Sequence, residues 1–358
     1  MQSLTVGYEE RKSNMKVYGV ALIGCGQMGE THLEHIYVKD NVKIACVCDV
    51  DITRAEYCAK KYNAGAVETD AGRCIERADV DVVIIATYPS THLWLLKECI
   101  KHKKHVICEK PITDTLENGM EFVRLVKENP DTKVLIGHIL RHNETYCTVA
   151  KMIKSGMIGF PIIMRMTQNH HTMNWNRYLR LIRETSPIID CGVHYFDVMR
   201  WFTGAEITSV SGVGMSTEND VPEGKNNYEM ATVKMSDGSV AFYEAGWTNA
   251  ITASNMKEFV GPCGSIRLIY RKDREEHREE GDLIEYYSVK DKKYNEINIM
   301  AERKPTDIQF DCLVDMIENG SEASPTIDDV YKSFYAAIQA ETCALPAKMD
   351  TKKLQKTK

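Results

Sequence analysis

Short hydrophobic runs alternate with amphipathic stretches over the first 140 or so residues. The first run, KVYGVALI at residues 16–23, is almost entirely apolar and includes β-branched side chains, which is typical of a strand buried on both faces. Similar runs predict strands at Val42–Val47, Val80–Ala86, Val106–Cys108 and Lys133–Gly137. The helical stretches between them end near Val38 and span Arg54–Tyr62, His92–His102 and Leu116–Glu128. This alternation predicts a doubly wound parallel sheet with right-handed crossovers.

After about residue 140 the pattern becomes that of an antiparallel sheet. Segments with the character of strands are Ile162–Thr167, Glu206–Val213, Glu229–Met235, Ser239–Trp247 and Ser265–Tyr270. The pair Asp237-Gly238 between two of them is a strong hairpin signal. Two helices follow, near Asp307–Asn319 and Ile327–Thr342. We therefore predict an α/β fold, with an N-terminal Rossmann doubly wound parallel sheet and a C-terminal α+β domain built on a mainly antiparallel sheet.

A chain of 358 residues exceeds the usual size of one hydrophobic core, so two domains are expected. We place the first at residues 15–140 and the second at 141–345. Residues 1–14 would form an arm that docks on a neighbouring subunit, unless translation starts instead at Met15. Residues 346–358 would form a frayed basic tail, and the charged stretch Arg271–Asp282 a solvated loop or edge.

Composition and charge exclude several classes of protein. The formal net charge of −6 disfavours a nucleic-acid partner. No apolar run reaches the roughly 18–20 residues that cross a bilayer, and the first residues lack the apolar stretch of a signal peptide. The twelve cysteines include no CxxC…CxxC or Cys/His spacing of a zinc site. Their core positions favour free thiols in a reducing compartment, and hence the cytoplasm.

The first strand leads directly into Gly24-Cys25-Gly26-Gln27-Met28-Gly29, which opens a helix. A lone GxGxxG is a weak signal, but here an acidic residue, Asp49, also ends the next strand. That full context predicts a dinucleotide site. Gly24 permits the tight turn, Gly26 lets the backbone approach the pyrophosphate, and Gly29 lets the helix pack on the sheet. The pyrophosphate would rest on the helix N-terminus, beside Gln27 and Met28.

A carboxylate at Asp49 would bind the adenosine ribose hydroxyls and repel a 2′-phosphate, which favours NAD over NADP. Arg54 leaves two alternatives, stacking on adenine or accommodating the phosphate of NADP. The loop at 86–92 follows a strand whose carboxyl end should face the cofactor. We therefore expect Thr87, Pro89 and His92 near NAD, although His92 taken alone is better explained as a helix-start residue.

Two further sequences hold candidate catalysts. Lys110 lies in Glu109-Lys110-Pro111, which closes a strand, so its ammonium would project towards the nicotinamide and hydrogen-bond a substrate oxygen. Asp190 and His194, four residues apart, share one helix face. A carboxylate one turn from a histidine orients the ring and supports the imidazolium, which suits proton transfer. The structural alternatives are a solvated lysine and a hydrogen-bonded core histidine.

In combination, these features resemble the glucose–fructose oxidoreductase / inositol dehydrogenase (Gfo/Idh/MocA) family from Val17 to about Leu345. The segments that carry the resemblance are GCGQMG, CVCDVD, ATYPSTH, CEKP, GHILRHN and DCGVHYFD. The resemblance implies Lys110, Asp190 and His194 as catalysts, with Glu109 near the nicotinamide ribose. It also implies an open-faced second sheet used for homo-oligomerisation into a dimer, tetramer or hexamer. Because all three catalytic positions are filled, a non-catalytic NAD-binding regulator is disfavoured.

These groups predict a dehydrogenase mechanism. An alcohol carbon would lie against nicotinamide C4, and His194 would remove the hydroxyl proton as hydride leaves. Asp190 would hold and charge the histidine, while Lys110 would stabilise the developing alkoxide. The reverse direction would use the same atoms.

The segment QNHHTMNWNRY at residues 168–178 combines amide, imidazole and aromatic groups. Aromatic faces stack on a sugar ring and amides bind hydroxyls, so a sugar, glycoside or polyol substrate is expected. The expected substrate contacts are Asn169, His171, Trp175, Arg177 and Tyr178, together with His138 and Arg141 of GHILRHN. The paired histidines could form half of a metal site, but no third ligand of suitable spacing follows, so no metal is expected.

The resemblance favours oxidation of the C3 hydroxyl of a pyranose or glycoside, because the family includes gut-bacterial enzymes with that activity. Inositol and aldose dehydrogenases are alternatives within the family. An NAD-dependent glycosidase is a third alternative, in which transient C3 oxidation initiates elimination and releases an aglycone without net turnover of the nicotinamide.

Overall fold

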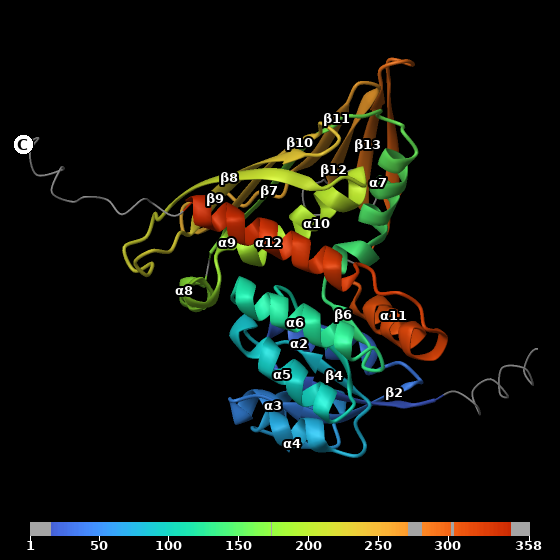
Figure 1. Ribbon diagram of the computed structural model, residues 1–358, viewed down its shortest axis with the longest axis vertical. Coiled ribbons are helices and arrows are strands. Elements are labelled where there is room, and N and C mark those ends of the chain that lie inside the picture. Colours follow the sequence, from blue (N-terminus) through green and yellow to red (C-terminus); the bar gives the residue numbers. More distant parts are fainter. Residues whose placement is uncertain (1–15, 173, 271–280, 302–303, 345–358) are drawn as a thin grey trace, which may run out of the picture. The chain divides into compact units, whose positions relative to one another are not determined.

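The structure is a computed structural model that describes residues 16–172, 174–270, 281–301 and 304–344 (Figure 1). The predicted arm at 1–14, the predicted tail at 346–358 and nearly all of the charged stretch at 271–282 lie outside these residues. The chain divides into two compact units. The first unit contains residues 1–139 and 304–327, and the second contains residues 140–303 and 328–358.

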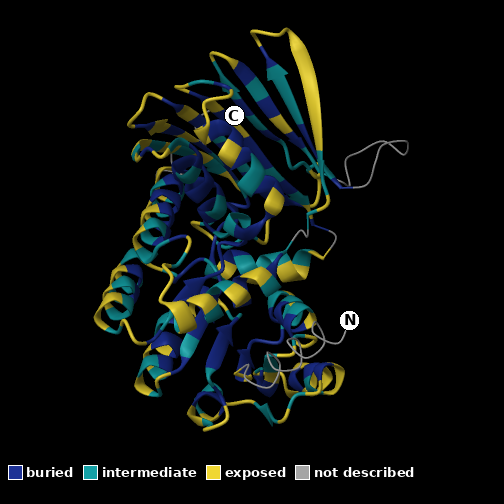
Figure 2. Cartoon of the chain, turned by 90° about the vertical axis from the view of Figure 1, so that its right-hand side faces the viewer, coloured by how far each residue is buried: buried dark blue, intermediate teal, exposed yellow. Residues whose placement is uncertain are grey.

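The first unit is built on a six-stranded sheet of order β3-β2-β1-β4-β5-β6, in which every strand pair is parallel. Its strands are β1 (Tyr18–Ile23), β2 (Val42–Cys48), β3 (Val67–Glu68), β4 (Val82–Ile85), β5 (His105–Cys108) and β6 (Val134–Ile136). All residues of β1 and β4 are buried, as their unbroken hydrophobic sequences predict (Figure 2). The strand order reverses on either side of β1, so the predicted doubly wound parallel sheet is confirmed.

Helices connect successive strands of this sheet. They are α2 (Gln27–Ile36), α3 (Ile52–Tyr62), α4 (Ala71–Glu76), α5 (Pro89–Lys101) and α6 (Leu116–Glu128). Helix α11 (Thr306–Asn319) joins them only after the chain has passed through the second unit. Its residues Phe310 and Leu313 are fully buried in the core of the first unit, and the hydroxyl of Tyr18 donates to Glu318 over 2.9 Å.

The second unit is built on an eight-stranded sheet of order β14-β13-β12-β11-β7-β10-β9-β8. Its strands are β7 (Ile163–His171), β8 (Ile207–Met215), β9 (Tyr228–Met235), β10 (Val240–Thr248), β11 (Lys257–Gly261), β12 (Gly264–Ile269), β13 (Asp282–Ser288) and β14 (Lys293–Ile299). Only the β7–β10 pair is parallel among the described pairs, so the mainly antiparallel sheet is confirmed. The predicted hairpin joins β9 to β10, with Gly238 at φ +87°.

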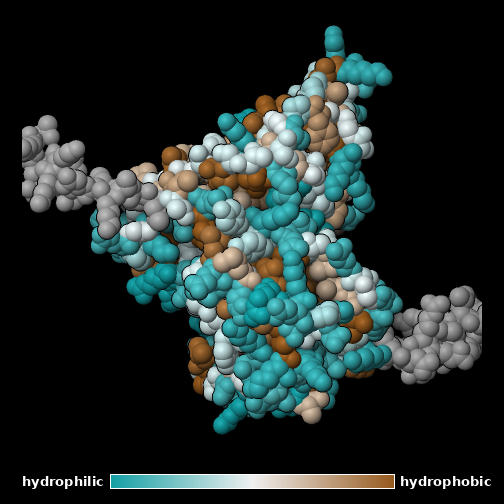
Figure 3. Space-filling view, in the orientation of Figure 1, coloured by the Kyte–Doolittle hydropathy of each residue, from teal (hydrophilic) through white to brown (hydrophobic). Residues whose placement is uncertain are grey.

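Helices of the second unit lie along one face of its sheet (Figure 1). They are α7 (Glu144–Lys154), α8 (Trp175–Glu184), α9 (Pro187–Asp190), α10 (Gly192–Thr203) and α12 (Ile327–Ala344), preceded by the short 3₁₀ helix η1 (Ile139–His142). No described element covers the opposite face. Its strands expose apolar side chains among polar ones (Figure 3), namely Ile163, Val213, Met215, Val240 and Tyr294.

Within the described residues, no helix combines the length and hydropathy that a membrane crossing requires. All twelve cysteines lie in described segments, and each is a free thiol.

Candidate active site

The turn from β1 to α2 leaves room for an anion. Gly24 has φ +97°, a conformation that favours glycine. A Cβ on Gly26 would meet no atom within 4 Å, whereas a Cβ on Gly29 would lie 1.9 Å from the carbonyl oxygen of Gly24. No side chain caps the start of α2, so its first N–H groups face this open turn. The predicted roles of the three glycines are therefore compatible with the backbone, and the turn fits a pyrophosphate on the helix N-terminus.

Asp49 lies directly beyond β2 and is bound to the same turn. Its Oδ2 accepts a hydrogen bond of 2.8 Å from the backbone N–H of Cys25, and its Oδ1 accepts one of 2.9 Å from the N–H of Asp51. Each carboxylate oxygen retains a further lone pair with which to accept a ribose hydroxyl. Arg54, in the first turn of α3, is exposed and forms an ion pair with Asp51 at 3.4 Å.

The loop between β4 and α5 is held by a buried histidine. Pro89 is the first residue of α5, and the side chain of Thr87 hydrogen-bonds the side chain of Thr91 over 2.7 Å. The His92 ring is fully buried between the carbonyl oxygens of Pro111, 3.1 Å from Nδ1, and Thr87, 3.2 Å from Nε2. Burial lowers the pKa of His92, so a neutral ring donates to one carbonyl at a time. His92 thus joins the loops that follow β4 and β5.

Glu109 and Lys110 follow β5 at its carboxyl end. Lys110 is partly exposed, whereas Glu109 is buried and accepts a hydrogen bond of 2.8 Å from Nε2 of His32 on α2. Burial alone would raise the pKa of Glu109. The hydrogen bond from His32, together with the charges of Lys110 and Lys304, outweighs burial and lowers it. The first unit therefore keeps a carboxylate beside a lysine at the predicted nicotinamide end of the sheet.

The second unit presents Asp190 and His194 on adjoining short helices. Asp190 is the last residue of α9, His194 lies in the first turn of α10, and Cys191 between them has a right-handed helical backbone. Asp190 and His194 are partly exposed, whereas all the remaining residues from Thr185 to Arg200 are buried. Asp190 and His194 therefore lie on two consecutive helices, not on the single helix predicted, and both are partly exposed in an otherwise buried segment.

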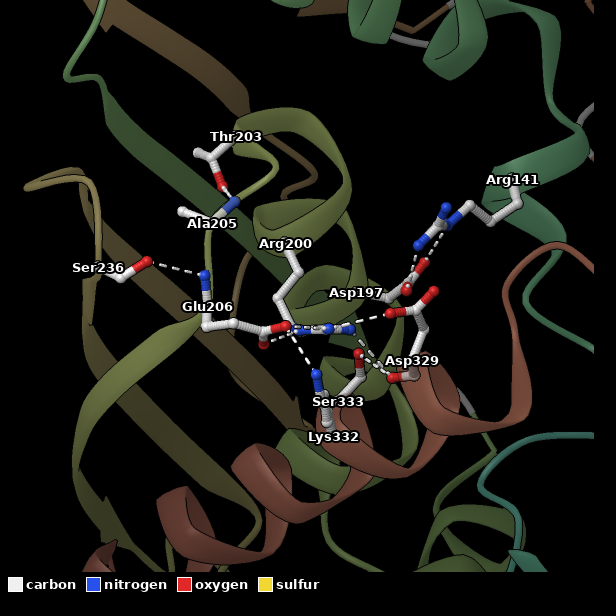
Figure 4. Close-up of polar contacts among 10 residues, drawn as sticks. All are labelled: Arg141, Asp197, Arg200, Thr203, Ala205, Glu206, Ser236, Asp329, Lys332 and Ser333. Atoms are coloured by element: carbon white, nitrogen blue, oxygen red, sulfur yellow. Dashed lines mark hydrogen bonds and ion pairs between the residues drawn. The ribbon is translucent and has the colours of Figure 1, made fainter.

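Ion pairs fix α10 within the second unit (Figure 4). Arg141 of η1 binds Asp197 through two hydrogen bonds of 2.7 and 2.8 Å, and its guanidinium lies 4.9 Å from the ring centre of Trp201. Arg200 binds both carboxylate oxygens of Glu206, at 2.8 and 3.0 Å, and Oδ1 of Asp329 at 2.9 Å. These bonds connect α10 to η1, to the start of β8 and to α12.

The predicted substrate segment forms the end of β7 and the start of α8. Tyr178 packs against Trp247 with ring centres 5.5 Å apart, and its hydroxyl lies 3.4 Å from Nδ1 of His170. Burial raises the pKa of Tyr178, and the nearby Cys191 and Asp190 raise it further against the opposing effect of Arg177. Tyr178 therefore lies close enough to Asp190 and Cys191 to feel their charges.

The other predicted substrate residues have varied surroundings. Asn169 is buried and donates to Glu244 over 2.6 Å. The exposed His171 has its Nδ1 3.2 Å from the carbonyl oxygen of Ile251, and the indole of Trp175 donates to Asp220 over 2.7 Å. Arg177 is exposed on α8, His138 is buried just beyond β6, and Arg141 binds Asp197 as described.

Three residues near these groups were not selected from the sequence. His32 contacts Glu109, His170 rather than His171 contacts Tyr178, and the ammonium of Lys304 donates to Sδ of Met28 over 3.2 Å. The place of His32 on the buried face of α2, three residues after Gly29, was an available signal. Among the described residues, no group of three or more His, Cys, Asp or Glu side chains could hold a metal ion.

Models of known protein families match segments in both units of the chain. Residues 18–138 match the model described as the Gfo/Idh/MocA oxidoreductase family, NAD-binding Rossmann fold. Residues 146–267 match the model of the Gfo/Idh/MocA C-terminal domain. The two matches belong to one family and together span more than half of the chain.

Individual relatives are similar over most of the sequence. Inositol 2-dehydrogenase 4 of Saccharopolyspora erythraea is 29% identical over 226 residues, which are 63% of this chain and 65% of that protein. Scyllo-inositol 2-dehydrogenase (NAD(+)) of Bacillus subtilis is also 29% identical, over 69% of this chain and 72% of that protein.

Solved structures share the fold at lower sequence identity. The scyllo-inositol dehydrogenase of Lactobacillus casei with bound NAD(H) and scyllo-inositol has a TM-score of 0.72 at 21% identity, covering 92% of this chain and 97% of that chain. UDP-N-acetylglucosamine 3-dehydrogenase of Acidithiobacillus ferrooxidans has a TM-score of 0.75 at 20% identity, covering 92% of this chain and 98% of that chain. Both family models and the glycine turn lead to the same conclusion: this chain belongs to the Gfo/Idh/MocA family of oxidoreductases and uses NAD as its cofactor.

Proposed function

We propose that this chain is an NAD-dependent dehydrogenase that oxidises a secondary ring hydroxyl of a cyclic polyol or sugar to a ketone. One observation carries the proposal. Asp190 and His194 are the partly exposed residues in a segment that is otherwise buried from Thr185 to Arg200. A core histidine would be enclosed like its neighbours, whereas a proton-transfer pair must reach substrate.

The candidate residues would take different roles in the reaction. NAD, when bound, supplies the hydride acceptor. His194 would take the hydroxyl proton, and Asp190 would orient the imidazole and stabilise its charged form. Lys110 would donate a hydrogen bond to the substrate oxygen as negative charge develops on it. Asp49 would bind the hydroxyls of the adenosine ribose, and Glu109 would lie near the nicotinamide ribose.

Inositol is the substrate class that the relatives favour. Both named curated relatives are inositol 2-dehydrogenases, and they align with most of this chain. Tyr178 near Asp190 adds an aromatic face suited to a polyol ring. We therefore propose a myo- or scyllo-inositol as the first substrate to test.

A second candidate is oxidation at C3 of a pyranose or glycoside. The aromatic group formed by His170, Tyr178 and Trp247 favours it, because aromatic faces stack well on pyranose rings. A reaction that releases an aglycone without net NADH formation would instead identify the glycosidase alternative.

The deciding experiment measures NADH formation by the full chain against a panel of inositols, aldoses and glycosides. We then expect Lys110→Ala and His194→Ala each to lower kcat at least about a hundredfold, with only a small change in NAD affinity. Asp190→Asn should be milder, because the amide still orients the ring. The double variant should lose less than the product of the single losses, since both groups act on one oxygen.

Matched controls come from the first unit. Lys101→Ala and His102→Ala alter a lysine and a histidine at the end of α5 and should leave kcat unchanged. A His194→Ala variant with near-normal single-turnover rates across the pH range would show that His194 is a structural residue. No oxidation of any panel member, with NAD still bound, would reject the dehydrogenase.

We also propose that the uncovered face of the second sheet associates with another copy of the chain. Its exposed apolar side chains, including Val213 and Met215, favour burial in such a contact. The test compares the oligomeric state of Val213→Lys with that of the unaltered chain by size-exclusion chromatography. Identical oligomers would reject association through this face. The free thiols are compatible with the reducing cytoplasm that we propose as its compartment.

A further inference from the structure

A buried histidine–carboxylate pair joins α2 to the end of β5. Nε2 of His32 lies 2.8 Å from Oε1 of Glu109, and the two side chains are 0% and 7% exposed. The residues are 77 positions apart in the sequence. A hydrogen bond to a carboxylate in such a buried place is strong, and its loss is costly.

The surroundings leave the Glu109 carboxylate little freedom. A Cβ on Gly137, directly beyond β6, would lie 2.9 Å from Oε2 of Glu109, so the carboxylate occupies the space of a missing side chain. The charged or titratable groups that face it come from four elements: His32 on α2, Lys110 after β5, Lys304 before α11 and His92 on α5. Three of these stretches lie far from Glu109 in the sequence, so tertiary structure creates this environment.

The hydrogen bond also fixes the histidine ring. Nδ1 of His32 is buried and has no hydrogen-bond partner among the described residues. A proton on Nδ1 would therefore be buried without an acceptor, whereas a proton on Nε2 points at the carboxylate. The ring thus serves as a fixed donor towards one oxygen of Glu109.

The position of this pair in the sheet gives it a function. In a doubly wound sheet the dinucleotide extends across the carboxyl ends of the strands, with its two halves on either side of the reversal in strand order. Asp49 after β2 belongs to the adenosine side, so Glu109 after β5 belongs to the nicotinamide side. His32 and the pyrophosphate turn are parts of the same helix, α2.

We infer that His32 is a positioning residue of the cofactor site, which fixes the carboxylate of Glu109 for the nicotinamide half of NAD. His32 does not contact the cofactor and acts through Glu109. Its bond connects the helix that receives the pyrophosphate with the strand end that carries Glu109 and Lys110. The inference rests on NAD binding and does not depend on which alcohol is oxidised.

The test compares variants that remove or keep the donor. His32→Leu removes the N–H, whereas His32→Gln places an amide N–H near the position of Nε2. Binding of NAD and NADH to the full chain is measured by fluorescence titration without substrate, alongside the melting temperature. We expect His32→Leu to weaken NAD binding about tenfold and His32→Gln to remain within about threefold of the unaltered chain. The loss should be larger for NAD than for NADH, because only the oxidised ring is positively charged.

His35 provides a matched control one turn along α2. Its Nδ1 lies 2.8 Å from the hydroxyl oxygen of Thr306, so His35→Leu also removes a histidine contact of α2 within the first unit. We expect it to lower the melting temperature without changing NAD affinity. If His32→Leu behaves like His35→Leu, His32 stabilises the fold only, and the inference is overturned.

Two further variants keep the test decisive if His32→Leu does not fold. His32→Asn has a shorter amide and should weaken NAD binding more than His32→Gln at similar stability. Glu109→Gln combined with His32→Asn should weaken binding by less than the product of the single effects. Independent effects, or equal affinities for the two amide variants, would contradict the role assigned to His32.

Discussion

The two units hold their functional groups by different physical means. In the first unit, backbone turns at the ends of parallel strands place the glycine loop, Asp49 and Lys110. In the second unit, the helix that carries His194 is held by side-chain ion pairs from Arg141 and Arg200. The candidate groups of the first unit therefore depend mainly on backbone space and conformation, and those of the second unit mainly on buried charge.

This difference predicts different weaknesses. A backbone turn fails when a side chain is added where glycine is required, and salt or pH changes affect it little. An ion pair fails when one partner is removed or neutralised, because the other charge then remains in a poorly solvated place. Variants at three places in the chain, each with a control, test this contrast.

The largest effect is expected at the Arg141–Asp197 pair, whose side chains are 10% and 2% exposed. Arg141→Met removes the guanidinium from a buried carboxylate and should destabilise the second unit by about 3–5 kcal/mol. Chemical denaturation measures this loss. Arg141→Met combined with Asp197→Asn should recover part of it, because the remaining group is no longer charged. If Arg141→Met were as stable as the unaltered chain, the Arg141–Asp197 pair would not be what holds α10.

A smaller effect is expected at the glycine turn. In Gly29→Ala the new Cβ would lie 1.9 Å from the carbonyl oxygen of Gly24, so α2 must shift away from β1. We expect a loss of about 1–3 kcal/mol in stability and a weakening of NAD binding. Calorimetric titration with NAD measures the binding.

Gly26→Ala separates these two contributions, because a Cβ there meets no protein atom within 4 Å. It should fold normally and weaken NAD binding alone, through contact with the pyrophosphate. If both glycine variants bound NAD with unchanged affinity, this turn would not be the binding site of the NAD pyrophosphate.

The smallest effect is expected in the stability of the second unit at acidic pH, through Glu206. Hydrogen bonds from Arg200 lower the pKa of Glu206 to about 2, and Lys332 adds to this against the opposing effect of burial. Because the folded-state pKa lies below the unfolded value of about 4.3, the stabilisation is present above about pH 4. It is lost as the pH falls towards about 2. The Glu206 side chain is 52% exposed, so screening limits the contribution to below about 1 kcal/mol.

Melting temperatures of Glu206→Gln and of the unaltered chain, measured between pH 7 and pH 2, test this contribution of Glu206 to stability. The variant should be slightly less stable than the unaltered chain at pH 7 and equal to it near pH 2. Glu121→Gln on α6 of the first unit is the control. Hydrogen bonds from Arg124 also lower the pKa of Glu121 to about 2, but the Arg124 side chain is 52% exposed, whereas that of Arg200 is 6% exposed. A larger effect at Glu121 than at Glu206 would contradict the contrast between the units.

The sequence predicted the parallel sheet more completely than the antiparallel one. Strands β1 and β4 are buried on both faces, so hydrophobic runs alone identify them. Strand β3 of the first sheet and strands β11, β13 and β14 of the second were not predicted. All residues of β14 except the last two are exposed, so its sequence KYNEINI contains no apolar run. Such a strand is defined by its pairing with a neighbour, which a local pattern does not record.

By itself, the sequence determined the features that depend on neighbouring residues. The glycine turn, the acidic residue after β2 and the spacing of Asp190 and His194 all follow from short segments, because the backbone geometry of a turn or helix is local. The tertiary structure decided the features that join distant segments. These are the return of α11 to the first unit, the bond between His32 and Glu109, and the pairing of Arg141 with Asp197. In each case the chain must close a long loop before the contact forms, so only the packed core fixes which side chains meet.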